Sequence, residues 1–100
     1  MPTSWQHLKT KRLDAMNPAE RTEYDRAYAA AKLAAEVGDR VRQAREAAGI
    51  SQRELARRMG TSQAAVDRLE AGGVGATLTT LQRVATALGL TVIVDLKATA

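Results

Sequence analysis

The side chains whose types and spacing are most suited to binding or catalysis lie in residues 60–73, GTSQAAVDRLEAGG. Ala65, Val66 and Leu69 fall on one side of a short helix-like run, at helical spacing. The other side carries hydrogen-bonding groups with hardly any bulk: Gln63, Ala64, Asp67 and Arg68. An amide, a carboxylate and a guanidinium together can donate and accept hydrogen bonds. Spacing alone leaves open whether this face recognises a partner or is an ordinary solvated helix face.

Other chemistry is limited by residues that the chain lacks or carries only once. There is no cysteine, and His7 is the single histidine. Cys-ligated and His-based metal sites and Ser–His or Cys–His catalysis are therefore excluded. The glycine-rich run at 72–75 lacks the lysine of a phosphate-binding P-loop. We expect no enzyme activity, no metal and no cofactor.

The charge balance suits an anionic partner such as nucleic acid, without requiring one. The 100 residues carry 15 Lys and Arg against 11 Asp and Glu, a net charge of +4. No apolar run approaches the ~18 residues of a membrane helix, and the start, MPTSWQHLKTKRL, lacks the apolar stretch of a signal peptide. We expect one small cytoplasmic domain with an appendage, for which a dimer interface would add buried surface.

The elements that must position the polar face begin with a capped helix. Residues 1–16 show no sustained hydrophobic period, so we expect them to be extended or partly disordered in isolation. Asparagine, proline and glutamate within 17–20 form a helix start. The alanine-rich segment 21–37 continues with helical spacing. Gly38 leaves open whether this segment and the apolar stripe at 41–48 form two helices or one.

Two short helices are then marked by their ends. Ser51 and Glu54 form a capping box that opens the first, and Gly60 ends it. Thr61 or Ser62 caps the second, which is the helix that carries the polar face. The polar face is therefore expected on a helix that follows another after a glycine turn.

The last part of the chain changes from helix to strand character. Residues 77–89 have a threonine cap, an apolar helical face and a closing glycine. Residues 90–96, LTVIVDL, are β-branched and too short for another stable helix, so they predict a strand. This strand has no partner in an otherwise helical chain.

The stretch 41–73, VRQAREAAGISQRELARRMGTSQAAVDRLEAGG, resembles the Xre, or phage-repressor-like, helix-turn-helix family. With 77–89 as the following helix, the resemblance covers about half of the chain. It implies a mainly α fold: a five-helix-type Xre domain over 37–89, an N-terminal extension over 1–36 that is helical from about residue 18, and a C-terminal strand and tail over 90–100. The matching positions are Arg45, Gly49, Ile50, Ser51, Gln52, Leu55, Ala56, Met59, Gly60, Ser62, Val66, Leu69, Glu70 and Gly72.

The resemblance implies that the second helix of the motif enters the major groove of operator DNA. The positions that match base-facing residues are Ser62, Gln63, Ala64 and Arg68. The helix before it matches the part that grips the phosphate backbone, with Ser51, Gln52 and Arg53. Ala64 departs from the family pattern, which often has a longer polar residue there. Arg57 and Arg58 can add phosphate contacts or form a solvated charge run.

The same resemblance implies a structural role for two charged residues. Arg45 and Glu70 occupy positions that form an internal ion pair in the family. A guanidinium can bridge two helices through several directed hydrogen bonds. We therefore expect these residues to hold the motif together rather than to contact DNA.

The C-terminal ending resembles that of HigA- and HipB-type antitoxins, in which a strand pairs with its counterpart in a second subunit. An exposed edge strand seeks backbone partners, and a two-fold dimer supplies one. The alternative is a strand that packs on its own domain or a frayed tail. The residues assigned to dimerisation are Leu90, Val92, Ile93, Val94 and Leu96.

The N-terminal extension holds all three aromatic residues and is interpreted as a toxin-binding arm. Many antitoxins of the resembling family use such an extension against a RelE/HigB-like ribonuclease toxin. The residues assigned to this role are Trp5, Leu8, Leu13, Tyr24 and Tyr28. Alternatively, the tyrosines pack a supporting helix. The function expected is a type II antitoxin that represses its own operon as a dimer, and the alternative is a stand-alone Xre-type repressor without a toxin partner.

Overall fold

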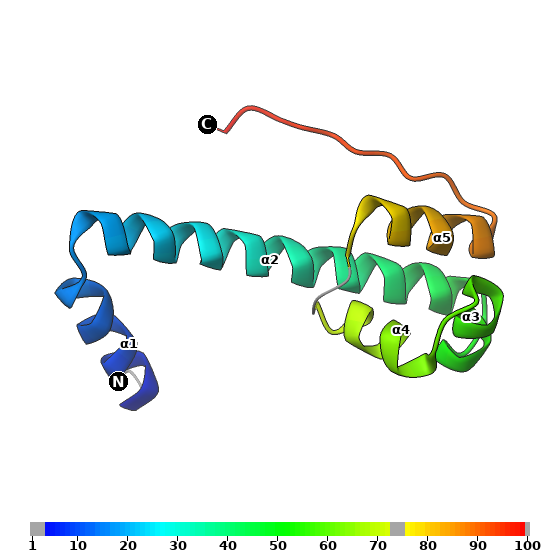
Figure 1. The fold of residues 1–100 in the computed structure, drawn as a ribbon, viewed down its shortest axis with the longest axis horizontal. Coiled ribbons are helices and arrows are strands. Elements are labelled where there is room, and N and C mark those ends of the chain that lie inside the picture. The colour runs from blue at the N-terminus through cyan, green and yellow to red at the C-terminus, as the bar shows by residue number, and fades with distance from the viewer. Residues whose placement is uncertain (1–3, 73–75, 100) are drawn as a thin grey trace. The chain divides into compact units, whose positions relative to one another are not determined.

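The computed structural model describes residues 4–72 and 76–99, except for the side chains of 4–7. Within these ranges the chain forms five helices and no strand (Figure 1). They are α1 (Ser4–Ala15), α2 (Pro18–Ala47), α3 (Gln52–Met59), α4 (Gln63–Glu70) and α5 (Leu78–Leu88). The mainly helical fold class is therefore confirmed. The chain divides into two compact units, Met1–Lys32 and Leu33–Ala100, and α2 contributes to both.

Helix α1 corrects the expectation that residues 1–16 are extended or disordered. Its 12 residues, SWQHLKTKRLDA, contain neither glycine nor proline, so nothing in them breaks a helix. They also have no apolar stripe, which is why hydrophobic periodicity missed the helix. Within the first unit, the ammonium of Lys9 lies 5.1 Å from the ring centroid of Tyr28 on α2. Tyr28 in turn stacks on Tyr24, with their centroids 6.4 Å apart.

Helix α2 begins at the predicted cap and passes through Gly38 without a break. The side chain of Asn17 accepts a hydrogen bond from the Glu20 backbone N–H at 2.8 Å. Gly38 is buried, and a Cβ atom there would lie 2.6 Å from the carbonyl oxygens of both Leu69 and Glu70. The glycine is therefore explained by close packing against the end of α4, and the question of one helix or two is settled as one.

The three short helices begin and end as their local sequences predict. The hydroxyls of Ser51, Ser62 and Thr77 each accept the backbone N–H three residues further on, at 3.1 Å. Gly60 makes the turn between α3 and α4 with a φ of 70° in the left-handed region. Of the two cap candidates for α4, Ser62 is the one used.

The core of the second unit fixes which face of α4 is exposed. Leu55 of α3 and Val66 of α4 are fully buried, and the small side chain of Ala56 lets the two helices approach closely. Partly buried side chains such as Ile50 and Met59 pack around this cluster. The buried apolar residues of the cluster are Val41, Leu55, Ala56, Val66, Leu69 and Val84. They come from α2, α3, α4 and α5, so the apolar side of α4 faces a core that four helices share.

The predicted strand at 90–96 is not present in the described residues. The Leu90 backbone N–H donates to the Ala85 carbonyl at 2.8 Å and completes the end of α5. Beyond it, the chain to residue 99 runs as coil (Figure 1). A strand requires ladder hydrogen bonds to a neighbour, and no second strand exists in the described part of the chain. Val92 is half-buried, whereas Ile93 and Leu96 are 86% and 92% exposed.

Candidate nucleic-acid interface

Helix α4 presents the polar face that its sequence predicts. Gln63, Ala64 and Arg68 are exposed together with Asp67, while Val66 and Leu69 are buried beneath them. The hydroxyl of Ser62 caps the helix, which places Ser62 at the start of the same surface. The structure therefore brings the four predicted base-facing residues onto one exposed surface, formed by α4 and its N-cap.

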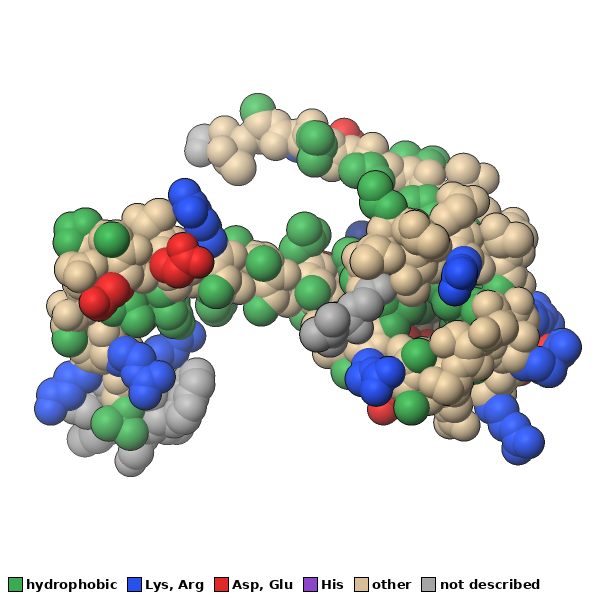
Figure 2. Space-filling view, viewed as in Figure 1, with side chains coloured by type: hydrophobic (Ala, Val, Ile, Leu, Met, Phe, Trp, Pro, Cys, Tyr) green, Lys and Arg blue, Asp and Glu red, His purple; other side chains and the backbone are tan. Residues whose placement is uncertain are grey.

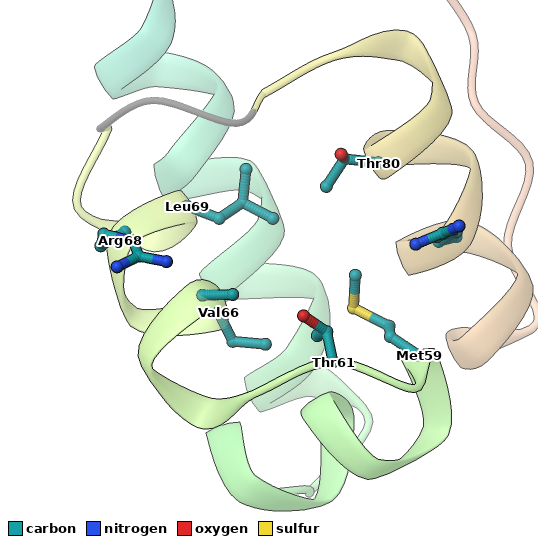
Figure 3. A pocket seen from close by; sticks show the side chains of 8 residues that line it. Met59, Thr61, Val66, Arg68, Leu69 and Thr80 are labelled. Carbon is teal, nitrogen blue, oxygen red and sulfur yellow. The ribbon is translucent and has the colours of Figure 1, made fainter.

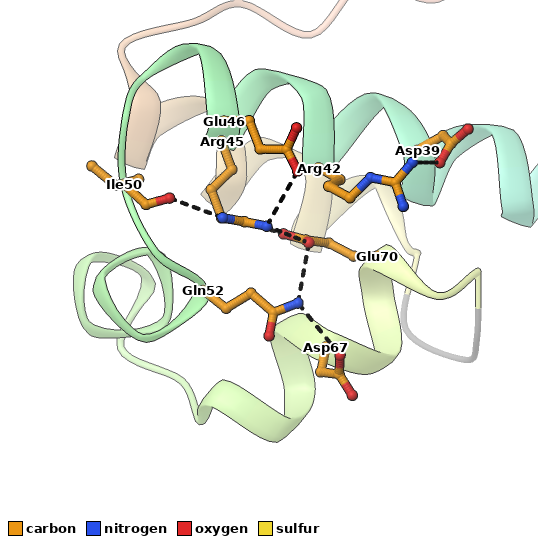
Figure 4. Close-up of polar contacts among 8 residues, drawn as sticks. All are labelled: Asp39, Arg42, Arg45, Glu46, Ile50, Gln52, Asp67 and Glu70. Carbon is orange, nitrogen blue, oxygen red and sulfur yellow. Dashed lines mark hydrogen bonds and ion pairs between the residues drawn. The ribbon is translucent and has the colours of Figure 1, made fainter.

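An ion pair anchors the far end of α4 to α2 (Figure 4). Arg45 donates to Glu70 twice, from Nε to Oε2 at 2.6 Å and from Nη2 to Oε1 at 3.0 Å. The third guanidinium nitrogen donates to the Ile50 carbonyl at 2.9 Å. Glu70 is only 7% exposed. This bidentate geometry fixes both the position and the rotation of α4 relative to α2.

The pKa values of the pair reflect this arrangement. Burial acts to raise the pKa of Glu70, but hydrogen bonds from Arg45 and Gln52 and the nearby positive charge outweigh it. The pKa of Glu70 therefore lies below its ordinary value. The hydrogen bond to Glu70 raises the pKa of Arg45. Both groups are charged at neutral pH, so the pair is present under ordinary conditions.

Gln52 has a different environment from the one that the resemblance implies. Its Nε2 atom lies 3.2 Å from Glu70 Oε1 and 3.4 Å from Asp67 Oδ1 (Figure 4). Two carboxylates require the amide nitrogen, not the oxygen, to face them. The donor group of Gln52 is therefore engaged within the protein, and the residue links the start of α3 to α4.

The arginines of α3 and α4 differ in whether they have acidic partners. Glu54 lies 2.6 Å from Arg57 and 3.1 Å from Arg58. Hydrogen bonds from these two arginines lower the pKa of Glu54 to about 2. Arg53 and Arg68 are exposed and form no ion pair with any described residue. The predicted contacts Arg53 and Arg68 thus have free guanidinium groups, whereas Arg57 and Arg58 are partly neutralised.

Sequence reasoning missed one further basic residue, Arg83 on α5. It too forms no ion pair or hydrogen bond within the described residues. It lines a cavity of about 170 Å³ together with Arg68. The sequence feature that could have indicated Arg83 is that α5, LTTLQRVATAL, contains no acidic residue that could pair with it. Arginine side chains project from the surface over α3, α4 and α5 (Figure 2).

The residues assigned to a toxin partner lie in the first unit. Leu8 and Tyr28 are 63% and 56% exposed, and Leu13 and Tyr24 are half-buried. The side chain of Trp5 lies outside the described residues. The structure therefore leaves an apolar and an aromatic side chain available on this unit.

In residues 4–72 and 76–99, no group of three or more His, Cys, Asp or Glu side chains is placed to hold a metal ion. None of the helices in the same ranges is both long and apolar enough to cross a membrane.

Comparison with known protein families matches residues 41–93 to a helix-turn-helix family. The match covers more than half of the chain and includes the whole of α3, α4 and α5. The chain therefore belongs to this helix-turn-helix family, of the Xre type, and is a DNA-binding protein of the transcriptional-regulator class. No curated protein and no solved structure matches it.

Proposed function

We propose that the chain is a dimeric transcriptional repressor in which α4 enters the major groove of operator DNA. The observation that carries the proposal is the exposed face of α4, held in place by the Arg45–Glu70 pair and by Gln52. The amide of Gln63 suits the N6/N7 edge of adenine, and Ala64 suits a thymine methyl group. Arg68 is long enough to reach a guanine or a phosphate. The low bulk of this face lets the helix lie deep between the base edges.

The start of α3 supplies backbone contacts in this proposal. Its free backbone N–H groups and the helix dipole favour a phosphate. Arg53 is exposed and unpaired among the described residues, so its charge is available to the same phosphate. The Ser51 oxygen accepts the Glu54 N–H, which leaves its hydroxyl hydrogen free to donate. Gln52 contributes by fixing α3 against α4.

A second copy of the chain is the proposed partner of the C-terminal segment. Ile93, Val94 and Leu96 are exposed apolar residues in the described coil. Pairing of 90–96 with the same segment of another copy would form the ladder that one chain cannot form alone. A dimer also supplies two α4 helices for half-sites about 10 base pairs apart. The activity proposed is binding without catalysis, in the cytoplasm.

The antitoxin role is the more specific part of the proposal. The first unit carries exposed Leu8 and Tyr28, outside the segment that matches the helix-turn-helix family. These side chains suit a RelE/HigB-like ribonuclease toxin as a protein partner. The alternative, a stand-alone Xre-type repressor, is favoured by the contacts of Tyr28 with Tyr24 and Lys9, which use the same ring to hold the unit together.

Selection of duplexes from a randomised pool tests the repressor proposal. The full chain should enrich an inverted repeat, because a two-fold dimer reads two identical half-sites. A pool that shows no enrichment while the protein is folded would contradict sequence-specific binding.

Co-expression tests the antitoxin proposal separately. The product of a small neighbouring reading frame should co-purify with the full chain and be lost from the variant Tyr28→Ala. The variant Lys11→Ala, an exposed change in the same unit, is the matched control. Sequence-specific DNA binding with no toxin-like neighbour or co-purifying protein would favour the stand-alone repressor.

A further inference from the structure

A cleft of about 170 Å³ lies between α4 and α5 (Figure 3). Val66 and Leu69 of α4 form apolar parts of its wall, and Met59 reaches into it from the end of α3. The polar groups that line it are two guanidinium groups and two hydroxyls, from Arg68, Arg83, Thr61 and Thr80. The cleft thus combines apolar side chains with four side-chain groups that can donate hydrogen bonds.

The two guanidinium groups of the cleft have no acidic partner among the described residues. Neither Arg68 nor Arg83 forms an ion pair or hydrogen bond with a described residue. No described acidic side chain lines the cavity. Two like charges beside one cavity repel each other, so an anion placed between them would be bound by both. Guanidinium groups prefer the oxygens of phosphate or carboxylate, which they contact in a bidentate manner.

The cleft, with a volume of about 170 Å³, is large enough to admit a phosphate-sized anion. One tetrahedral oxyanion fits this space, and threonine hydroxyls can donate to oxygens that the guanidinium groups leave free. Arg68 belongs both to the lining of this cleft and to the exposed face of α4.

We propose that this cleft binds one phosphate group of the DNA backbone, next to the groove that α4 enters. The inference rests on the proposed function. Arg83 and Thr80 contact the phosphate from α5, and Arg68 reaches it from α4. A phosphate held between the two helices sets the depth and register of α4 without reading sequence. Arg83 is therefore a DNA-binding residue outside the helix-turn-helix motif itself.

The test compares binding of Arg83→Ala and wild-type full chain to a short duplex of mixed sequence over a range of salt concentrations. Loss of the phosphate contact should reduce the slope of log K against log[salt] by about 0.9 for each bound subunit, and each lost contact should weaken binding roughly five- to tenfold near 0.1 M salt. Arg40→Ala is the matched control, because Arg40 is also exposed and unpaired but lies on α2, away from this cleft. Its slope should equal that of the wild type. Thermal melting checks that both variants remain folded.

An amide NMR titration with inorganic phosphate separates the two sources of the anion. An unchanged salt slope in Arg83→Ala overturns the proposal. In that case, if added phosphate shifts the amide signals of Thr61 and Thr80 to saturation in the wild type but not in Arg83→Ala, the cleft binds a free anion instead of DNA. If Arg83→Ala keeps the wild-type slope while Gln63→Ala loses sequence preference, the repressor function stands and this inference fails. If the wild type binds no duplex, both fail.

Discussion

Replacing Glu70 with alanine should destabilise the protein more than any change at an exposed carboxylate. Glu70 is 7% exposed and accepts two hydrogen bonds from Arg45 and one from Gln52. In Glu70→Ala, the Arg45 guanidinium keeps only the Ile50 carbonyl and the more distant Glu46 carboxylate, at 4.0 Å. Breaking a buried pair by removing one partner costs about 3–5 kcal/mol. The side chain of Arg45 is 13% exposed, which lets water reach it and places the expected cost near the lower value, about 3 kcal/mol.

Thermal unfolding followed by circular dichroism measures this effect. For a domain of this size, 1 kcal/mol corresponds to about 4–8 °C in Tm, so Glu70→Ala should lower Tm by roughly 12–24 °C. The control is Glu36→Ala, an exposed carboxylate on α2 with no hydrogen bond or ion pair to a described residue. If Glu70→Ala melts no lower than Glu36→Ala, the reasoning about the buried pair is wrong.

Three other perturbations test separate parts of the structure. Gly38→Ala should lower Tm, because the added Cβ would lie 2.6 Å from two backbone carbonyl oxygens at the end of α4. The overpacking cost is therefore expected near the upper end of the usual range, about 3 kcal/mol, which exceeds the ~1 kcal/mol by which alanine favours an isolated helix; a Tm equal to or above that of the wild type would refute the close packing. Acid should destabilise the wild type more steeply than Glu70→Gln as the pH falls below the ordinary pKa of glutamate, because a carboxylate with a lowered pKa stabilises the fold only while it is ionised; parallel pH profiles of Tm would show that ionisation of Glu70 contributes nothing. A chain truncated after Leu90 should elute as a monomer in size-exclusion chromatography if 91–96 pairs across a dimer, and an unchanged dimer would exclude strand pairing.

The local signals at helix ends could be predicted because the contacts involved span only a few residues. The hydroxyl caps at Ser51, Ser62 and Thr77 each bond to a backbone group three positions away. The exposed face of α4 followed from spacing alone, since Val66 and Leu69 had to be buried. These features depend on chemistry that lies next to each residue in the chain.

The features that sequence reasoning missed depend on contacts between distant residues, or lack the hydrophobic periodicity by which helices and strands are predicted. The role of Gly38 requires the carbonyl groups at the end of α4, which its neighbours in sequence do not reveal. Helix α1 has no apolar stripe to detect. The β-branched run at 90–96 favours a strand, but local preference cannot provide a partner strand. Gln52 engages two carboxylates of α4, a tertiary arrangement that the family resemblance did not convey.

The most direct test of the account is to separate sequence reading from backbone binding in two single variants. With the duplex that the wild type selects, Gln63→Ala should relax preference at one base pair in each half-site, by about 1–3 kcal/mol, and keep the wild-type salt slope. Arg53→Ala should keep the base preference and reduce the slope by about 0.9 for each half-site contact that is lost. If Gln63→Ala selects the same sequence with the same preference as the wild type, α4 is not the helix that reads the bases.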